Sequence, residues 1–293
     1  MKWIGRLFIL CVLCGLGGGS YTVIRYPDRT YQKAERLIAE YRSGISGTVN
    51  VESKTPWMDG PTGLAYRRLK IKRGREFPGL DLLAVRIDPK EYDFRVVAVP
   101  QNEIPSSYIS SVAAQEGAHF AINGSYFNSD LGILGLAISD GNVVSKMTTV
   151  GENRGIFYVD AKGRPGLNHR DNFSTKNVSQ ALQSGPWLVR GGKRKTTYKN
   201  PDHVRRRSAM CVDDDGLLVF IITDTFINGI TLPDLAGLME EEGAGELFCR
   251  EALNLDGGTS SQMMLWTGQN TILVRGFINV PVYIVAVPKS EEK

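Results

Sequence analysis

Cysteine and histidine are scarce in this sequence, with four cysteines and three histidines among 293 residues. Cys11 and Cys14 lie in an apolar N-terminal stretch, which leaves Cys211 and Cys249 for the folded part of the chain. Two cysteines are too few for a disulfide framework or a cysteine zinc site, and three scattered histidines do not predict a histidine zinc centre. Cys211 and Cys249 could form a disulfide or remain as two buried thiols, and the sequence favours the thiols.

A large excess of charge of one sign is also lacking. The chain has 35 basic and 31 acidic residues, for a net charge of +4. This balance lacks the basic footprint of nucleic-acid-binding proteins, so we expect no nucleic-acid partner. The sequence requires no cofactor with certainty. It leaves room for a calcium or magnesium ion bound through aspartates and backbone oxygens.

The N-terminal apolar run is too short to be an ordinary membrane span. Residues 7–16 are apolar, whereas roughly 20 such residues are needed to cross a bilayer. Lys2 and Arg6 precede this run, and small residues follow at positions 17–20. We therefore predict a signal peptide or signal anchor over residues 1–25, which engages the membrane at least during export. The domain is then extracytoplasmic: secreted, periplasmic or membrane-anchored.

Short apolar or alternating runs separated by Gly, Pro and Asp dominate the rest of the sequence. We expect strands at 63–71, 80–87, 92–99, 119–123, 134–138, 155–159, 208–212, 217–223, 252–255, 270–275 and 280–287, and helices at 108–116 and 231–242. Few helices and many strands predict one α+β domain with mixed sheets over residues 57–288. A helical spacer at 26–56, with its helix at 31–41, precedes this domain, and a polar tail at 289–293 follows it.

The segment 252–261 is the most informative part of the chain, because an apolar run ends at Asp256 and polar or small residues follow directly. These residues are Gly257, Gly258, Thr259 and Ser260. Glycines allow backbone amides to approach a ligand closely, and hydroxyls can cap the next structural element. The pattern indicates a catalytic loop at a strand end, and a plain turn is the alternative.

Three further segments place polar groups where a predicted strand begins or ends. Asn123 ends one predicted strand and Gly124 follows it, and the Asn123 amide could orient a sugar hydroxyl or a phosphate oxygen. Ser184 precedes a Gly-Pro turn and is free to face a cleft. Arg207 comes directly before a strand, so a rigid element would hold its fork of donors toward phosphate.

Taken together, these segments resemble the phosphodiester glycosidase family over about residues 60–288. The motifs that carry the resemblance lie at 123–127, 134–141, 183–188, 207–209 and 253–261. The chain departs from the family pattern at Cys211, where a glycine is expected, and at Thr259, where a third glycine is usual. Both departures concern backbone freedom near the site.

The resemblance implies cleavage between a sugar anomeric carbon and a phosphate oxygen, in a phosphate-linked sugar or polysaccharide. In our hypothesis Asp256 is the nucleophile or general base, and Asn123 orients the substrate. Arg207 and the amides of residues 257–260 hold the phosphate. Asp224, at another strand end, is the rival catalytic carboxylate.

Two alternatives use the same residues. In the first, Asp224 and Asp256 hold a divalent metal, and the protein is a phosphodiesterase that breaks the phosphorus–oxygen bond. In the second, the protein is a non-catalytic envelope protein that binds a phosphate-bearing polysaccharide.

Overall fold

The computed structural model describes residues 49–73, 79–226 and 228–290, all of which belong to one compact unit. The predicted signal segment, the helix expected at 31–41 and the end of the polar tail lie outside the described residues. Within the described ranges, no helix has the length and apolar character needed to cross a bilayer.

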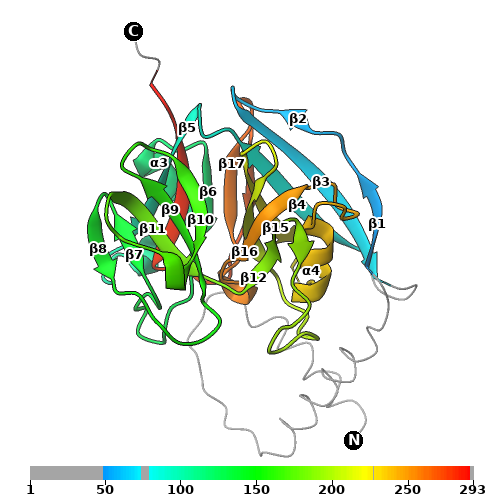
Figure 1. Cartoon of the computed structure of the whole chain (residues 1–293). Helices are drawn as coiled ribbons and strands as arrows, with labels where there is room; N and C mark the ends of the chain where they lie inside the picture. The colour runs from blue at the N-terminus through cyan, green and yellow to red at the C-terminus, as the bar shows by residue number, and fades with distance from the viewer. Residues whose placement is uncertain (1–48, 74–78, 227, 291–293) are drawn as a thin grey trace, which may run out of the picture. The chain divides into compact units, whose positions relative to one another are not determined.

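The largest sheet has nine strands, in the order β1-β3-β4-β15-β14-β16-β12-β13, and β2 also pairs with β3 (Figure 1). Its strands are β1 Val49–Lys54, β2 Met58–Asp59, β3 Leu64–Arg73, β4 Leu80–Ile87, β12 Trp187–Arg190, β13 Lys193–Arg194, β14 Ser208–Asp213, β15 Leu218–Asp224 and β16 Cys249–Asn254. Strand β1 corrects the predicted boundary, because it lies in the supposed spacer and pairs with β3. Its alternating Val49 and Val51 pack against the core, so the domain begins before residue 57.

Two further sheets have five strands each, in the orders β10-β9-β11-β7-β8 and β18-β17-β6-β19-β5. The first contains β7 Ala137–Ser139, β8 Asn142–Ser145, β9 Gly155–Asp160, β10 Pro165–His169 and β11 Val178–Ser184. The second contains β5 Tyr92–Ala98, β6 Phe120–Asn123, β17 Met263–Trp266, β18 Thr271–Val274 and β19 Val282–Pro288.

The α+β class with few helices is confirmed, but the mixed character of the sheets is not. Every strand pairing among the described residues is antiparallel, including β7 with β8 and β9 with β10. The physical reason is the type of connection. Tight turns such as those at Asp140–Gly141 and at Gly163 join antiparallel neighbours, whereas a parallel pair needs a long crossover.

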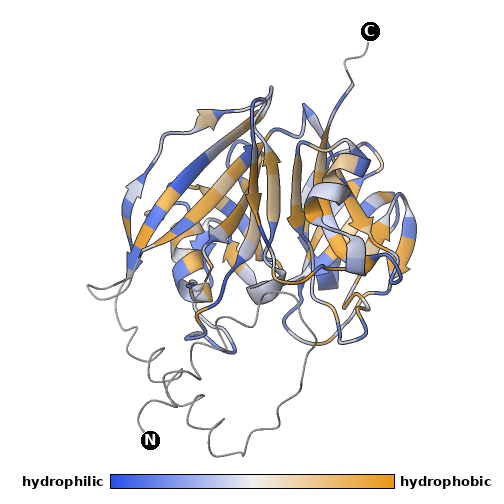
Figure 2. Ribbon diagram, turned by 180° about the vertical axis from the view of Figure 1, so that it is seen from behind, coloured by the Kyte–Doolittle hydropathy of each residue, from blue (hydrophilic) through white to orange (hydrophobic). Residues whose placement is uncertain are grey.

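Alternation along the strands divides the core between the two faces of the large sheet. On β4, Leu83 and Val85 belong to a cluster that also includes aromatic residues of the other sheets. Leu82 and Ala84 belong to a second cluster on the opposite face. In the first cluster, the rings of Phe120 and Phe220 join two sheets, with centroids 4.6 Å apart. Hydrophobic residues are concentrated on the strands, and hydrophilic residues on the loops (Figure 2).

Among the described residues, two α-helices pack on the sheets, at the positions where the sequence predicted helices (Figure 1). Helix α3 (Ile109–Glu116) packs on β6 and β19 and ends at Gly117, which has the left-handed φ of 63° expected of a helix terminus. Helix α4 (Leu232–Met239) packs on β12 and begins after Thr231, whose side chain accepts the Asp234 amide. The same part of the chain contains the short 3-10 helices η1 Ile104–Ser106, η2 Arg170–Asn172 and η3 Gly258–Ser260.

A disulfide joins Cys211 on β14 to Cys249 on β16, which corrects the expectation of two free thiols. The register of these neighbouring strands places the two Cα atoms 5.7 Å apart. That distance lies within the range a disulfide requires. The sequence could not supply this information, because it does not show that β14 and β16 are neighbours.

Candidate functional site

The ends of three adjacent strands bring the predicted charged residues to one edge of the large sheet. Strand β14 lies between β15 and β16 and is antiparallel to both. The start of β14 therefore lies beside the ends of its two neighbours. As a result, Arg207, Asp224 and Asp256 share this edge although they are distant in sequence.

The backbone of Asp256 is fastened at both its polar groups to the end of β6. The Asn123 side-chain amide donates a 2.8 Å hydrogen bond to the Asp256 carbonyl, and the Asp256 amide donates to the Gly124 carbonyl at 3.0 Å. The Asn123 Oδ1 atom accepts bonds from the Ser208 hydroxyl at 2.7 Å and the Gln262 amide at 3.1 Å. The side chain of Asn123 is fully buried. Direct contact with a sugar, which the sequence suggested, would break these bonds, so the geometry makes Asn123 a positioning residue.

Gly124, whose carbonyl accepts the Asp256 amide, fits at this position because it has no side chain. A Cβ atom at this position would lie 2.9 Å from the Leu182 side chain and 3.0 Å from the Val282 carbonyl oxygen. These contacts are tighter than a Cβ atom normally makes, so a larger residue would require the Leu182 side chain and the Val282 backbone on β19 to shift. Gly124 thus supports the position of Asp256 through its backbone.

The Asp256 carboxylate is half-buried and hydrogen-bonded within its own loop. Its Oδ1 atom accepts the Gly257 amide at 2.8 Å, and the Ser260 hydroxyl also bonds to the carboxylate. Burial raises the pKa of Asp256, and these two hydrogen bonds lower it, with a net upward direction. A carboxylate with a raised pKa at a strand end is the kind of group that catalytic sites use.

The sequence predicted that the amides of residues 257–260 bind phosphate, but most of these amides already donate hydrogen bonds within the protein. Gly257 donates to Asp256, Gly258 donates to the Arg206 carbonyl at 2.8 Å, and Ser260 donates to the Gly257 carbonyl at 3.2 Å. These three amides are therefore committed within the protein. Thr259 is one of the two positions at which the sequence departs from the expected family pattern, and its side chain is exposed, so it displaces no core atom.

Arg207 is a partly buried cation beside this loop. Its Nε donates to the Ile230 carbonyl at 3.2 Å and its Nη2 to the His203 carbonyl at 2.7 Å. Burial lowers the pKa of Arg207 to about 10, while the neighbouring Tyr126 opposes that shift. The guanidinium is held by backbone carbonyls, and no carboxylate within the described chain forms an ion pair with it. This leaves its charge available for an anionic ligand.

Tyr126 lies in the 123–127 motif, where its ring was a candidate for apolar contact with a sugar, but its polar pairing with Asn254 was not predicted from the sequence. The Tyr126 hydroxyl accepts a 2.7 Å bond from the Asn254 amide and donates to the Gly185 carbonyl at 2.8 Å. Burial raises the pKa of Tyr126, the Asp256 charge raises it further, and the Arg207 charge lowers it. The Tyr126 hydroxyl therefore lies close enough to both Asp256 and Arg207 for their charges to affect its pKa. The one signal in the sequence was an asparagine within an apolar strand, two residues before Asp256.

Ser184 lies in this polar cluster but does not face a cleft. Its side chain is fully buried, and its hydroxyl donates a 2.9 Å bond to the Asn254 carbonyl. The prediction that Ser184 contacts substrate is thus replaced by a structural contact to β16. The serine is buried because β11 enters the core directly before the turn at Gly185.

Asp224 lies at the same end of the large sheet as Asp256, but its side chain forms an ion pair with Arg68. Its Oδ2 atom accepts a 2.6 Å bond from Arg68 on β3, and both side chains are partly exposed. No hydrogen bond joins Asp224 to Asp256 in the described chain. Nowhere in the described part of the chain do three or more His, Cys, Asp or Glu side chains form a group arranged to hold a metal ion.

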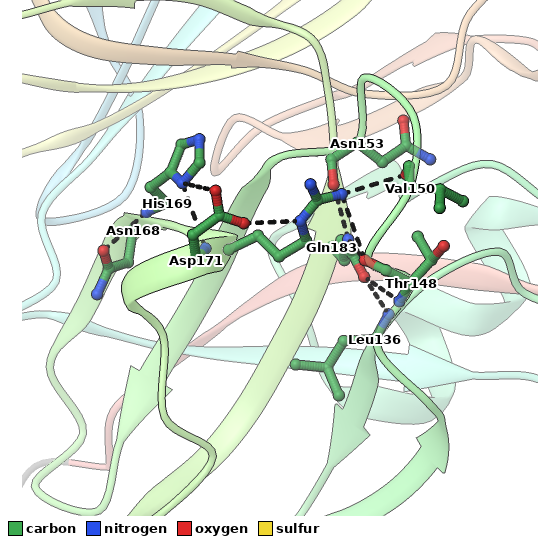
Figure 3. Close-up of polar contacts among 9 residues, drawn as sticks. Leu136, Thr148, Val150, Asn153, Asn168, His169, Asp171 and Gln183 are labelled. Atoms are coloured by element: carbon green, nitrogen blue, oxygen red, sulfur yellow. Dashed lines mark hydrogen bonds and ion pairs between the residues drawn. The ribbon is translucent and has the colours of Figure 1, made fainter.

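The segment 148–153 is held by hydrogen bonds to Gln183, which Figure 3 shows. The fully buried Gln183 donates from Nε2 to the carbonyls of Thr148 at 2.8 Å and Asn153 at 2.6 Å. Its Oε1 accepts the amides of Leu136 at 2.9 Å and Thr148 at 3.0 Å. Every polar atom of one buried side chain is therefore used to fix this segment.

The fastened segment contributes a further carboxylate. A Cβ added at Gly185 would lie 2.3 Å from the Glu152 carbonyl oxygen, which places the segment directly over Gly185. Glu152 is close enough to Tyr126 to raise its pKa slightly. Nothing in the sequence singles out Glu152, because its electrostatic effect on Tyr126 depends on the fold of the segment.

The chain belongs to the phosphodiester glycosidase family, whose model matches residues 116–287. That range contains Asn123, Arg207 and Asp256. The catalytic domain of zebrafish N-acetylglucosamine-1-phosphodiester alpha-N-acetylglucosaminidase, solved in a form auto-inhibited by its pro-peptide, has a similar structure. The TM-score is 0.59 at 16% identity, covering 83% of this chain and 89% of that one.

Two further proteins are similar. A hypothetical protein from Synechocystis has a TM-score of 0.57 at 14% identity, covering 80% of this chain and 64% of that one. The SPbeta prophage-derived uncharacterized protein YomE of Bacillus subtilis is 29% identical over 167 residues, which is 53% of this chain. The matched region is 25% of the length of YomE, so this chain spans a small part of that relative.

Proposed function

We propose that this protein hydrolyses the bond between a sugar anomeric carbon and a phosphodiester. The observation that carries the proposal is the Asp256 carboxylate, whose backbone is fixed by Asn123 and Gly124 at the sheet edge occupied by Arg207. Family membership supports a glycosidase of this type. The site thus combines a positioned carboxylate with a cation suited to phosphate.

The chemistry depends on the leaving group. Phosphate leaves more readily than an ordinary sugar alcohol, so the enzyme needs less protonation of the departing oxygen. The main requirements are to stabilise a positively charged sugar and to hold the phosphate. Asp256 acts on the anomeric carbon as nucleophile, or as the base for the attacking water, while Arg207 holds the phosphate charge. The Tyr126 hydroxyl lies within electrostatic range of both.

The substrate we propose is a phosphate-linked sugar or polysaccharide outside the cytoplasm. The zebrafish relative is named for an N-acetylglucosamine 1-phosphodiester, so substrates of that kind are the first to test. The extracytoplasmic location rests on the basic, apolar and small residues of the N-terminal segment.

The test is hydrolysis of a panel of sugar 1-phosphodiesters in oxygen-18 water, with products resolved by mass spectrometry. Cleavage at the anomeric carbon places the label in the sugar, whereas cleavage at phosphorus places it in the phosphate. Asp256→Asn should abolish turnover, and Asp224→Asn is the matched control at the same sheet edge. Label in the phosphate would replace the glycosidase with a phosphodiesterase. Binding of the panel without turnover would indicate a binding protein.

A further inference from the structure

Two arginines of the large sheet contact the same tryptophan. Trp57 lies between β1 and β2, Arg67 lies on β3 and Arg86 lies on β4. The guanidinium carbon of Arg67 lies 4.3 Å from the centre of the Trp57 ring, and that of Arg86 lies 4.5 Å from it. All three residues precede the range 116–287 that the family model matches, so family membership does not account for them.

Arg67 is a buried cation that no carboxylate of the described chain pairs with. It is 6% exposed, and its Nε atom finds no hydrogen-bond acceptor there. Its Nη1 atom donates a long bond of 3.4 Å to the Gly245 carbonyl. Burial lowers the pKa of Arg67 and the charge of Glu246 opposes that shift, but the Glu246 carboxylate forms its ion pair with Lys54. A buried charge without a partner is costly, which indicates that an anion belongs beside Arg67.

The neighbouring Arg86 is only partly neutralised. Its Nε atom lies 3.3 Å from Oδ2 of Asp213, but neither atom has a hydrogen-bond partner among the described residues. The other oxygen of Asp213 accepts the amides of Asp215 at 3.0 Å and Leu217 at 2.9 Å. The Arg86 side chain is 22% exposed, whereas Arg67 and Asp213 are buried. A ligand would therefore reach the cluster from the side of Arg86.

Two guanidinium groups thus offer unused donors in one small region. Both guanidinium carbons lie within 4.5 Å of the centre of the Trp57 ring, and both Nε–H groups lack an acceptor within the described chain. Guanidinium forks of this kind bind phosphate and carboxylate oxygens. Arg67 and Arg86 together with Asp213 carry a net positive charge, so a bound anion would balance the cluster.

The cluster lies at the other end of β14 from the candidate functional site. Asp213 ends this strand, whereas Arg207 directly precedes its first residue, Ser208. The six residues of the strand span about 20 Å when extended. An anion beside Arg67 is therefore too distant to take part in chemistry at Asp256.

We propose that Arg67, Arg86 and Trp57 form a second anion-binding site, which takes a phosphate group. Arg67 supplies the unpaired charge, Arg86 supplies a second fork at the entrance, and the Trp57 ring holds both guanidinium groups. A phosphate has enough oxygens to accept both forks, whereas one fork satisfies the two oxygens of a carboxylate. Free phosphate and a phosphate carried by an anionic polymer present the same oxygens. The site is independent of the proposed function.

The test is a titration of the full chain with inorganic phosphate at constant ionic strength, followed by tryptophan fluorescence, with sodium chloride as the reference salt. Phosphate should change the emission of Trp57 in a saturable way, and Trp57→Phe should remove that change. Arg67→Met should weaken phosphate binding at least about tenfold. This variant should fold, because it removes a buried charge without a partner.

Two matched controls separate this site from other arginines. The Arg190 guanidinium also lies over a tryptophan, 4.8 Å from the centre of the Trp187 ring, but it forms an ion pair with Glu251. Arg190→Met should therefore leave the phosphate affinity measured at Trp57 unchanged. Arg207→Met should leave it unchanged as well, because Arg207 belongs to the candidate functional site.

Loss of the fluorescence response in Arg67→Met, with the response kept in both controls, would support the site. A response that Arg67→Met does not alter, or an equal response to chloride, would overturn it. If Arg67→Met does not fold, Arg67→Lys decides by the same criteria, since lysine keeps the charge but lacks the fork of donors.

A second titration with poly(glycerol phosphate) distinguishes the two sources of the ligand. A response to the polymer that depends on Arg67 would support a polymer-borne phosphate, and a response to inorganic phosphate alone would support the free ion. The absence of a response to both would overturn the site.

Discussion

Asn123 and Asp256 are 133 positions apart in the sequence, and a 2.8 Å hydrogen bond joins the side-chain amide of the first to the backbone carbonyl of the second. This bond connects the end of β6 in one sheet to the loop after β16 in another. The candidate catalytic carboxylate therefore depends on the packing of two sheets against each other. Substitutions around it should change stability and catalysis in distinguishable ways.

Asp256→Asn should lower kcat at least about a thousandfold while making the protein more stable at pH 7. Burial raises the pKa of Asp256, so the folded protein binds this proton more tightly than the unfolded chain. Ionisation at neutral pH then destabilises the folded state, and asparagine avoids it. Thermal unfolding of both proteins from pH 3 to 8 checks this.

The difference in stability between Asp256→Asn and the wild-type protein should be largest above the pKa of Asp256 in the folded protein. It should vanish below about pH 3, where Asp256 is protonated in both the folded and the unfolded state. A lower Tm for Asp256→Asn at pH 7 would show that the hydrogen bonds to Gly257 and Ser260 outweigh burial.

The pH dependence of kcat/KM should be bell-shaped. The acid limb should lie above the ordinary aspartate value of about 3.9, because the pKa of Asp256 is raised and the carboxylate form is required. The alkaline limb should fall near pH 10, where Arg207, with a pKa lowered to about 10, loses its proton.

Arg207→Lys should raise KM and move the alkaline limb, because an ammonium has a different pKa and lacks the fork of donors. An alkaline limb that stays in place in this variant would assign it to another group.

Asn123→Ala should destabilise the fold by about 3 kcal/mol, because it leaves the Ser208 hydroxyl and the Gln262 amide without their buried acceptor. It should also lower kcat by roughly a hundredfold with a smaller change in KM, since the Asp256 backbone loses one of its two anchors. Urea unfolding and steady-state kinetics measure the two effects.

Ser208→Ala is the control for that variant, because it removes one bond to Asn123 and leaves the bond to Asp256. It should lower stability by about 1 kcal/mol and change kcat less than tenfold. A larger loss of kcat in Ser208→Ala than in Asn123→Ala would contradict the positioning role of Asn123.

The double variant Cys211→Ala/Cys249→Ala should lower the free energy of unfolding by about 4 kcal/mol, because the disulfide closes a loop with a sequence separation of 38. Activity at low temperature should be kept, since the bridge lies within β14 and β16 and not at their ends near the site. Urea unfolding with and without reductant checks this, and a double variant still sensitive to reductant would contradict it.

Gln183→Ala should release the segment 148–153 and speed tryptic cleavage at the exposed Lys146 and Arg154 that flank it. Mass spectrometry of the fragments identifies the sites. Gln180→Ala is the matched control, because Gln180 is a buried glutamine on the same strand that bonds to Asp140 and Val96 instead. Equal cleavage in both variants would show that strand β11, rather than the fastening of the segment, has been weakened.

Local patterns in the sequence determined many features that depend on neighbouring residues alone. Helix α3 and its end at Gly117, the start of α4 at Thr231, and most strands were predicted from periodicity, capping residues and turns. The motif residues around Asp256 also pointed to the family. These predictions succeeded because helix ends, turns and alternation are set within a few residues of chain.

Only the tertiary structure decided which strands are neighbours and which polar groups are already satisfied. It placed Ser184 in the core, engaged Asp224 with Arg68, joined Cys211 to Cys249, and turned Asn123 toward the backbone of Asp256. Each of these contacts joins residues far apart in sequence, and buried polar groups take whichever partner the packing of the sheets provides. The sequence named the chemical groups of the site, and the sheet order set their partners.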